Sequence, residues 1–585
     1  MPHRYHQEPN ILTSGTTTSR PQLFHAIKEK LKKGYSFPDF KADFMASLVV
    51  AMVAIPLGMA LAIASGVAPQ NGLYTVIIAG IVVAFLGGSR FQVTGPTAAF
   101  VVILAPIAHK YGLGGLLTAG LMSGFILLAM GLGRMGKLIQ FIPYPVVTGF
   151  TSGIAVVIAT LQLKDFFGLK ISNMPEGFLE KVITMAKSTS TVSWPESAVG
   201  LATLLLLLLW PKINKRIPAP LVALGLISVI TAILKSKYPG LVIDTIGTRF
   251  SYTINNMTGH GIPQTVPHFT FPWAHGTESF SITLQSIEAL IPSAFAIAML
   301  GAVESLLSAV VADGISQTKH DPDSELMALG IGNIICPFFG GVAATGAIAR
   351  TATNIRFGAK SPLSSILHGL ITLVVILLFA PYVSYLPMAG LSALLLLVSY
   401  NMAEIRHFTR ILKVGPKSDA TVLFICFLLT VSFDMVIGVT TGVLLAALLF
   451  IKKMASATST QILDNKAGTH HYQVPSDVLL YDINGPLFFG AAETAMEAID
   501  TIKDNVKVVF LLMEDVPVMD VTGLVALEST VEDLVVHKRS VYLIGVKSQP
   551  KELILRSGTI SKKVFFYRTV EDALDHYKDK QIPNK

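Results

Sequence analysis

The sequence predicts a polytopic α-helical membrane protein that carries a C-terminal α/β domain in the cytoplasm. Three observations lead to this fold class. Of the 585 residues, 52% are hydrophobic and only 14% are charged, whereas soluble domains average about 25% charged residues. Apolar stretches of membrane-helix length follow one another as far as Lys453. After Lys453, charged residues become frequent and the apolar runs shorten to the length of strands.

A membrane helix needs about 20 mostly apolar residues, because unpaired backbone groups in hydrocarbon cost several kcal/mol each. The transmembrane domain is therefore predicted over residues 44–453, after a polar segment over residues 1–43. Its fourteen predicted elements cover residues 44–65, 72–88, 96–109, 114–133, 145–163, 197–211, 219–235, 287–312, 325–341, 347–358, 363–381, 387–401, 418–433 and 435–451. The polar stretch 236–286 is expected to form an outer loop.

The distribution of basic residues predicts the orientation, since Lys and Arg concentrate in cytoplasmic loops. With the N-terminus placed in the cytoplasm, basic residues fall mainly in the inner turns. They are Arg90, Arg134, Lys137, Lys212, Lys215, Arg216, Lys319, Arg356, Lys360, Arg406, Arg410, Lys413, Lys417, Lys452 and Lys453. An even number of spans leaves the C-terminus in the cytoplasm as well. The net charge of +8 is thus assigned to membrane orientation, and no nucleic-acid partner is expected.

Two short breaks interrupt the membrane elements. In the segment 94–98, Gly95-Pro96 ends an extended stretch, and a proline at the start of a helix costs no hydrogen bond. The segment 340–351 has the same character and leads into a second half-length helix. Two interrupted elements, one in each half of the domain, indicate a transporter with two structural repeats and a substrate site in the middle of the membrane.

The breaks predict an anion site. Each half-helix begins with unpaired N–H groups and a dipole of about half a positive charge, so two facing N-termini attract an anion. Arg350 adds a full positive charge, and Thr97 and Thr351 offer hydroxyl donors. Simple kinks are the alternative, but an arginine inside the membrane favours a site. The predicted substrate-binding residues are Gly95, Pro96, Thr97, Ala98, Ile348, Ala349, Arg350 and Thr351.

Three further polar residues are candidates for the transport pathway. Glu304 lies mid-span without a basic neighbour in sequence, and because burial favours a neutral carboxyl it is predicted to carry a proton with the anion. The alternative is a carboxyl that is paired to a neighbouring helix. Gln70 and Tyr74 follow the first span, where they either contact the substrate or hold the loop in place.

The sequence contains no phosphate-binding loop, zinc-ligand spacing or hydrolase elbow, which argues against an ATP-driven pump and against an enzyme. No catalytic residue, metal site or cofactor is predicted. After a linker over residues 454–474, a domain over residues 475–581 alternates strands and helices, which predicts a small α/β layer. The strands are expected at 478–483, 506–513 and 540–546, and the helices at 491–503 and 523–538.

Several of these motifs together resemble the SulP anion-transporter family, and the last domain resembles the STAS domain that ends most of its members. The motifs are Ala54-Ile55-Pro56-Leu57-Gly58-Met59-Ala60, Pro69-Gln70-Asn71-Gly72-Leu73-Tyr74, Thr94-Gly95-Pro96-Thr97 and Gly346-Ala347-Ile348-Ala349-Arg350-Thr351. The resemblance implies seven plus seven elements in inverted repeats, arranged as a core of elements one to four and eight to eleven and a gate. It also implies an elevator-like movement of the core past the gate, and a homodimer.

Within the family, the segments 296–306 and 318–320 look most like bacterial members that transport C4-dicarboxylates. The hypothesis is therefore a secondary active transporter in the bacterial cytoplasmic (inner) membrane that takes up succinate, fumarate or aspartate together with protons. One alternative keeps the fold and changes the substrate to sulfate or bicarbonate, with proton or sodium coupling. A passive anion channel and an anion sensor are two further alternatives.

The STAS-like domain contains one candidate regulatory residue, Thr522. It lies in the segment 518–524, which is the characteristic turn into a helix in this domain. Bacterial regulators with the domain are phosphorylated on a serine in an Asp-Ser-Ser/Thr-Gly turn. Here Val521 replaces one hydroxyl and Thr522 keeps the other, so a phosphorylation switch competes with a simpler role in docking a cytoplasmic protein or steadying a dimer.

Overall fold

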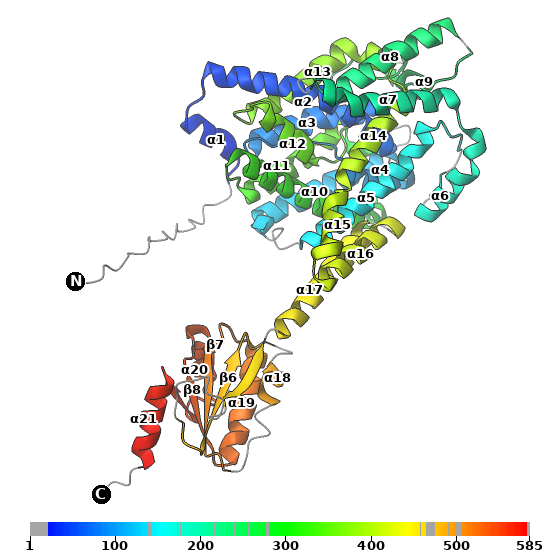
Figure 1. Ribbon diagram of the computed structural model, residues 1–585. Coiled ribbons are helices and arrows are strands. Elements are labelled where there is room, and N and C mark those ends of the chain that lie inside the picture. The colour runs from blue at the N-terminus through cyan, green and yellow to red at the C-terminus, as the bar shows by residue number, and fades with distance from the viewer. Residues whose placement is uncertain are drawn as a thin grey trace. The chain divides into compact units, whose positions relative to one another are not determined.

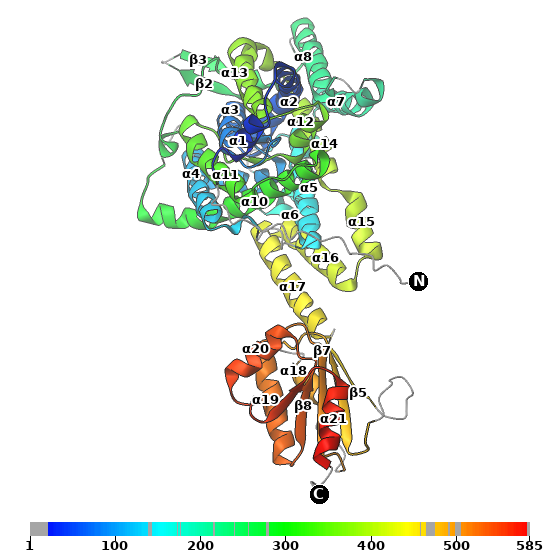
Figure 2. The same ribbon diagram turned by 90° about the vertical axis from the view of Figure 1, so that its left-hand side faces the viewer.

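The structure is a computed structural model, shown in Figure 1 and, turned by 90°, in Figure 2. It divides into two compact units, Met1–Val443 and Leu444–Lys585, and each is described by itself. The structure describes residues 22–137, 143–171, 174–175, 177–214, 217–238, 240–254, 257–275, 280–433, 435–456, 458–463, 474–488, 492–497 and 505–581. Much of the predicted N-terminal segment 1–43 and of the predicted linker 454–474 lies outside these residues.

Ten helical segments among the described residues are long and apolar enough to cross a membrane. They are α2 (Phe37–Ala64), α3 (Pro69–Leu86), α4 (Ala98–Leu132), α5 (Tyr144–Phe166), α7 (Trp194–Ile213), α8 (Ala219–Lys237), α10 (Leu284–Ser316), α13 (Leu363–Val383), α14 (Met388–Met402) continued by α15 (Ile405–Val414), and α17 (Met435–Ala455). Three predicted elements appear as the shorter helices α11 (Pro322–Ile335), α12 (Ile348–Arg356) and α16 (Lys417–Ser432). The predicted polytopic membrane fold is confirmed.

The long helix α4 contains two of the predicted elements. Its backbone leaves the helical region at Gly112, where φ is 66° and ψ is −172°. This conformation with positive φ is open to glycine because glycine has no Cβ. The two parts of α4 on either side of Gly112 correspond to the elements predicted at 96–109 and 114–133.

The helices of the first unit pack in two groups. In the first group α2, α3, α4, α10, α11, α12 and α13 pack against one another, and in the second α5 contacts α14 and α16 while α14 contacts α7, which contacts α8. The first group contains the elements that the family resemblance assigns to the core. The order long helix, helix, short strand, helix occurs once from α2 to α4 and again from α10 to α12, where the short helix η4 (Cys336–Phe339) is added before the strand; two such units are expected for two repeats.

Glycines set the distance between α4 and α11. A Cβ atom on Gly124 would lie 2.8 Å from the carbonyl oxygen of Gly330, and one on Gly330 would lie 2.9 Å from that of Gly124. The two backbones are therefore in direct contact. Such close approach through small residues is typical of membrane helices, because van der Waals contact and not water drives their association.

The segment 236–286, which was predicted to form an outer loop, contains structure that the sequence did not predict. The helix α9 (Ile246–Arg249) precedes an antiparallel hairpin of β2 (Ser251–Ile254) and β3 (Met257–His260), and the short helix η3 (Pro272–Ala274) follows. These elements are three or four residues long, which is too short for an apolar period to show. Other short helices of this unit are α1 (His25–Lys32), α6 (Phe178–Lys187), η2 (Thr189–Thr191) and η4 (Cys336–Phe339).

The second unit contains a five-stranded sheet in sequence order, with β5 antiparallel to β6 and the other neighbours parallel. The strands are β5 (Ser459–Leu463), β6 (Val478–Asn484), β7 (Val508–Asp515), β8 (Ser540–Ile544) and β9 (Val564–Tyr567). The helices are α18 (Ala492–Glu497), α19 (Val521–Val536), α20 (Ser548–Ser557) and α21 (Val570–Gln581).

The central strand β7 explains the layers of this domain. Val509 and Leu511 face a cluster that contains Leu527 of α19, while Phe510 on the other face meets Ala573 of α21. Figure 1 accordingly shows α19 and α21 on opposite faces of the sheet. Both faces are covered, and β7 is accordingly apolar from Val508 to Met513, as is usual in parallel sheets. The predicted α/β layer is confirmed.

Candidate functional site

The two predicted breaks meet inside the first unit. The strand β1 (Thr94–Gly95) pairs with β4 (Thr345–Gly346) in antiparallel register, so that Thr94 faces Gly346 and Gly95 faces Thr345. After a short turn, each strand leads into a helix, β1 into α4 and β4 into α12. Because the strands run in opposite directions, the helices leave in opposite directions and their N-termini face each other across the strand pair. We call this place, formed by residues 94–98 and 345–351, the crossing. The N–H groups and dipoles of both helices thus favour negative charge at one place.

Arg350, in the first turn of α12, lies directly at the crossing. Its guanidinium Nη2 donates to the carbonyl oxygen of Pro96 over 2.5 Å, and the residue is only 2% exposed. A Cβ atom on Gly95 would lie 2.6 Å from Nη1, so a side chain at this position would displace the guanidinium. Among the described residues, Nε and Nη1 have no hydrogen-bond partner. They are charged donors that a bound oxyanion or water can satisfy.

Glu304 reaches the same place from α10. Its Oε2 accepts a hydrogen bond of 2.7 Å from the hydroxyl of Thr97, the residue that precedes α4. Its charge is also near enough to be attracted by that of Arg350. The structure therefore brings Glu304 to the predicted anion site, and the Thr97 hydroxyl, predicted as a donor to the anion, donates to Glu304 instead.

The remaining predicted residues take different positions around the crossing. Thr351 is fully buried, and its hydroxyl oxygen accepts from the Val93 backbone N–H over 3.0 Å and from Ser308 over 3.2 Å. This hydroxyl holds the strand β1 in place. Gly95, Pro96 and Ala98 are buried at the crossing, whereas Ile348 and Ala349 are exposed at the start of α12.

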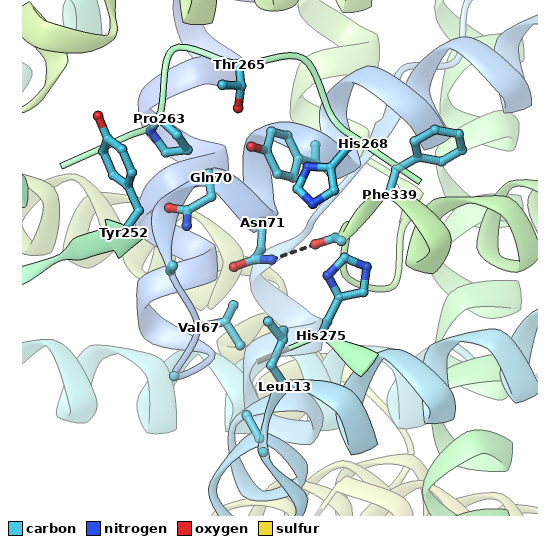
Figure 3. Close-up of a pocket in the computed structure, with 16 residues that line it drawn as sticks. Val67, Gln70, Asn71, Leu113, Tyr252, Pro263, Thr265, His268, His275 and Phe339 are labelled. Carbon is cyan, nitrogen blue, oxygen red and sulfur yellow. Dashed lines mark hydrogen bonds between the residues drawn. The ribbon is translucent and has the colours of Figure 1, made fainter. Parts of the chain in front are cut away.

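Gln70 and Tyr74 line a separate cavity of about 620 Å³ between the start of α3, the break in α4 and the segment 236–286 (Figure 3). Asn71, a residue without a predicted role of its own, donates to the carbonyl oxygen of Gly340 over 2.6 Å at the cavity wall. His275 also lines the cavity, and burial together with the nearby charge of His268 lowers its pKa. No residue of the crossing lines this cavity, so the structure does not bring Gln70 and Tyr74 to Arg350.

A buried polar network that sequence reasoning missed fixes the chain ahead of β1. Its centre is Glu325 of α11, which is 1% exposed and accepts hydrogen bonds from the backbone of Gly88 and Ser89 and from Gln92. The only sequence signal was the presence of polar residues inside membrane elements. Their convergence depends on pairing across more than two hundred positions, which periodicity does not reveal.

In the second unit, Thr522 lies in the first turn of α19 and is exposed. Asp520 caps this helix, because its carboxylate accepts from the Gly523 N–H over 2.7 Å. The N-terminus of α19 would favour a negative group on Thr522 through its dipole.

Similarity to known proteins places the chain in a family. Residues 40–426 match the sulfate permease family, and residues 471–573 match the STAS domain. The chain belongs to the sulfate permease family. It is 40% identical over 538 residues, 91% of this chain and 97% of the relative, to the putative sulfate transporter YvdB of Bacillus subtilis. It is 29% identical to the bicarbonate transporter BicA of Picosynechococcus, over 88% of this chain and 90% of that protein.

Solved structures confirm the fold. The murine anion transporter Slc26a9, in an inward-facing state, matches 95% of this chain and 94% of its own with a TM-score of 0.82 at 20% identity. The transmembrane domain of a cyanobacterial BicA matches 71% of this chain and 98% of its own with a TM-score of 0.58 at 24% identity. The protein is therefore an integral membrane protein with the fold of these transporters and a C-terminal STAS domain.

Proposed function

We propose that the protein is a secondary active transporter that binds a small oxyanion at the crossing of β1 and β4. The observation that carries this proposal is the buried Arg350, whose Nε and Nη1 lack partners among the described residues. A buried arginine with free donors is costly in a membrane protein unless a ligand or water satisfies it. The two helix N-termini beside it add positive potential without adding a further side-chain charge.

The charges at the crossing relate the substrate to proton coupling. Arg350 contributes one positive charge and the two helix N-termini together contribute about one more, while an ionised Glu304 removes one. The site thus carries roughly one net positive charge with Glu304 ionised, and roughly two with Glu304 protonated. We infer that it takes a monovalent anion without a proton and a divalent anion together with a proton on Glu304.

We propose sulfate or bicarbonate as the transported anion. The relatives compared above are named as sulfate and bicarbonate transporters, and the resemblance to dicarboxylate transporters gains no support from them. Sulfate is a dianion and bicarbonate a monoanion at neutral pH, so the charge balance gives each a different expected dependence on protons. Acidification is expected to stimulate uptake of sulfate more than uptake of bicarbonate.

We further propose that the first group of helices moves as a body past the second. The support is that both half-helices, Arg350 and Glu304 all belong to the first group, and buried hydrogen bonds such as that of Asn354 to the Phe91 carbonyl oxygen bind its strands and helices together. A site that lies within one rigid group can be carried without being dismantled. We also propose that the protein is a homodimer in a bacterial cytoplasmic membrane, as the family resemblance implies. Both termini are proposed to lie in the cytoplasm, because basic residues concentrate in the turns predicted on that side.

The test is uptake by purified full-length protein in liposomes, with labelled sulfate and with sulfate, bicarbonate, succinate, fumarate and aspartate as competitors. Uphill accumulation driven by an imposed gradient supports active transport, and uptake that only equilibrates contradicts it. Arg350→Ala is expected to abolish saturable uptake, whereas Arg356→Ala, an exposed arginine at the end of the same helix, is expected to retain it. Equal uptake by both variants would remove the site from the crossing.

A further inference from the structure

Next to the crossing, the buried carboxylate of Glu325 connects α11 to the chain segment that precedes β1. Glu325 Oε2 accepts from the backbone N–H groups of Gly88 and Ser89, each over 2.9 Å. Its Oε1 accepts from the side-chain Nε2 of Gln92 over 2.8 Å. Three donors thus satisfy a side chain that is 1% exposed. The carboxylate holds the segment from Gly88 to Gln92, which leads directly into β1.

Gln92 extends this connection to the residues of the site. The same Nε2 also donates to the hydroxyl oxygen of Ser305 over 2.6 Å, and Ser305 is the neighbour of Glu304 on α10. The amide of Gln92 also lies against Gly346 of β4, so closely that a Cβ atom there would overlap it. The side-chain amide of Gln92, oriented by Glu325, therefore touches both β4 and α10. The backbone of Gln92 continues into β1.

We infer that Glu325 is a positioning residue for the anion site and that it acts through Gln92. Its carboxylate fixes the Gln92 amide, and the amide fixes the distance between the crossing strands and the segment of α10 that carries Glu304. This inference rests on the proposed function, because it assigns Glu325 a role in the geometry of that same site. Among the described residues, the hydrogen bonds of Glu325 go to none of the predicted binding residues.

The Glu325→Gln substitution separates positioning from charge. The new amide retains an oxygen for the N–H groups of Gly88 and Ser89, but its NH₂ group then faces the NH₂ group of Gln92, so one charge-assisted hydrogen bond is lost. The half-saturation constant for the transported anion is expected to rise about tenfold, the factor that corresponds to about 1.4 kcal/mol. The maximal rate per folded molecule is expected to change much less.

A double substitution tests the same idea by rescue. In Gln92→Glu/Glu325→Gln the amide and the carboxylate exchange places, so the amide at position 325 can still accept from the backbone and donate to position 92. The carboxylate at position 92 can accept from it and from the Ser305 hydroxyl. We expect this pair to recover most of the lost affinity. Gln92→Glu alone places two carboxylates against each other, and it is expected to raise the half-saturation constant more than Glu325→Gln or the double substitution does.

Asp43 provides a matched control. It is fully buried and accepts from the Lys360 and Ser361 backbone and from the hydroxyls of Ser361 and Tyr35. None of these partners belongs to the crossing. Asp43→Asn is therefore expected to lower the melting temperature of the full-length protein and to leave the half-saturation constant within about twofold of wild type.

The experiment compares these variants in liposomes and measures how far sulfate or bicarbonate raises each melting temperature. An affinity loss in Glu325→Gln that the double substitution reverses supports the inference. If Glu325→Gln behaves like Asp43→Asn, with lower stability and unchanged half-saturation, the inference is overturned. If Glu325→Gln fails to fold, Ser305→Ala is measured in its place. An unchanged half-saturation constant in Ser305→Ala overturns the inference, and a raised one supports it. Wild-type protein that shows no saturable uptake of either anion would instead overturn the proposed function.

Discussion

The charge balance at the crossing predicts that Glu304→Gln changes which anion the protein prefers. Glu304 accepts from Thr97 at the start of α4, so its charge acts on an anion at that N-terminus, for which we take a separation of about 8 Å. At an effective dielectric constant of about 20, two unit charges at that separation interact by about 2 kcal/mol. Relative to wild type at a pH where Glu304 is ionised, the neutral side chain therefore favours a monoanion by about 2 kcal/mol and a dianion by about 4 kcal/mol. The preference for the dianion should rise about 30-fold.

The assay is initial uptake of sulfate and of bicarbonate by proteoliposomes over a range of external pH. In wild type, acidification protonates Glu304 and is expected to stimulate sulfate uptake, since a dianion then meets two net positive charges. In Glu304→Gln the neutral amide imitates the protonated carboxyl, so sulfate uptake is expected to become independent of pH. Glu288→Gln, on the same helix but outside the crossing, should retain the wild-type profile. Sulfate uptake by Glu304→Gln that still rises on acidification as in wild type would refute the reasoning.

Two further substitutions probe the crossing. In Gly95→Ala, the new Cβ atom 2.6 Å from Arg350 Nη1 should displace the guanidinium and abolish saturable uptake. Gly225→Ala, where no atom of the described residues lies within 4 Å of the added Cβ, should have little effect. Equal uptake kinetics in the two variants would contradict the close approach of Arg350 to Gly95. In Thr351→Val, the Val93 N–H loses its acceptor, which should cost about 1 to 3 kcal/mol of stability and lower the melting temperature. Thr353→Val, whose exposed hydroxyl donates to the Ala349 carbonyl oxygen of its own helix, should not lower it. Equal melting temperatures in the two variants would contradict a structural role for the Thr351 hydroxyl.

The features predictable from sequence were those that depend on local chemistry. Gly95-Pro96 marked one half-helix, and the glycines ahead of Arg350 marked the other, because backbone breaks and an intramembrane charge are visible in a single segment. Apolar length alone located the membrane elements. The repeat pattern predicted that the starts of the two half-helices meet. In the structure, the antiparallel pairing of β1 with β4 brings them together.

The features that sequence did not predict depend on contacts between distant segments. The partners Gln92 and Glu325 are separated by 233 positions, and neither residue type indicates the other. Thr97 and Thr351 were predicted as donors to the anion because hydroxyls at helix starts often serve that purpose. Which way each hydroxyl is used depends on its neighbours, Glu304 for Thr97 and Val93 for Thr351, and helical periodicity contains no such information.

The location of the bound anion decides whether the substrate site is at the crossing. Selenate, a heavier analogue of sulfate, could be diffused into crystals of the full-length protein and located by its anomalous scattering. The account predicts a peak within hydrogen-bond distance of Arg350 Nε or Nη1 and of the first N–H groups of α4 and α12. A peak in the separate cavity beside Asn71 and His275, with none at the crossing, would contradict it.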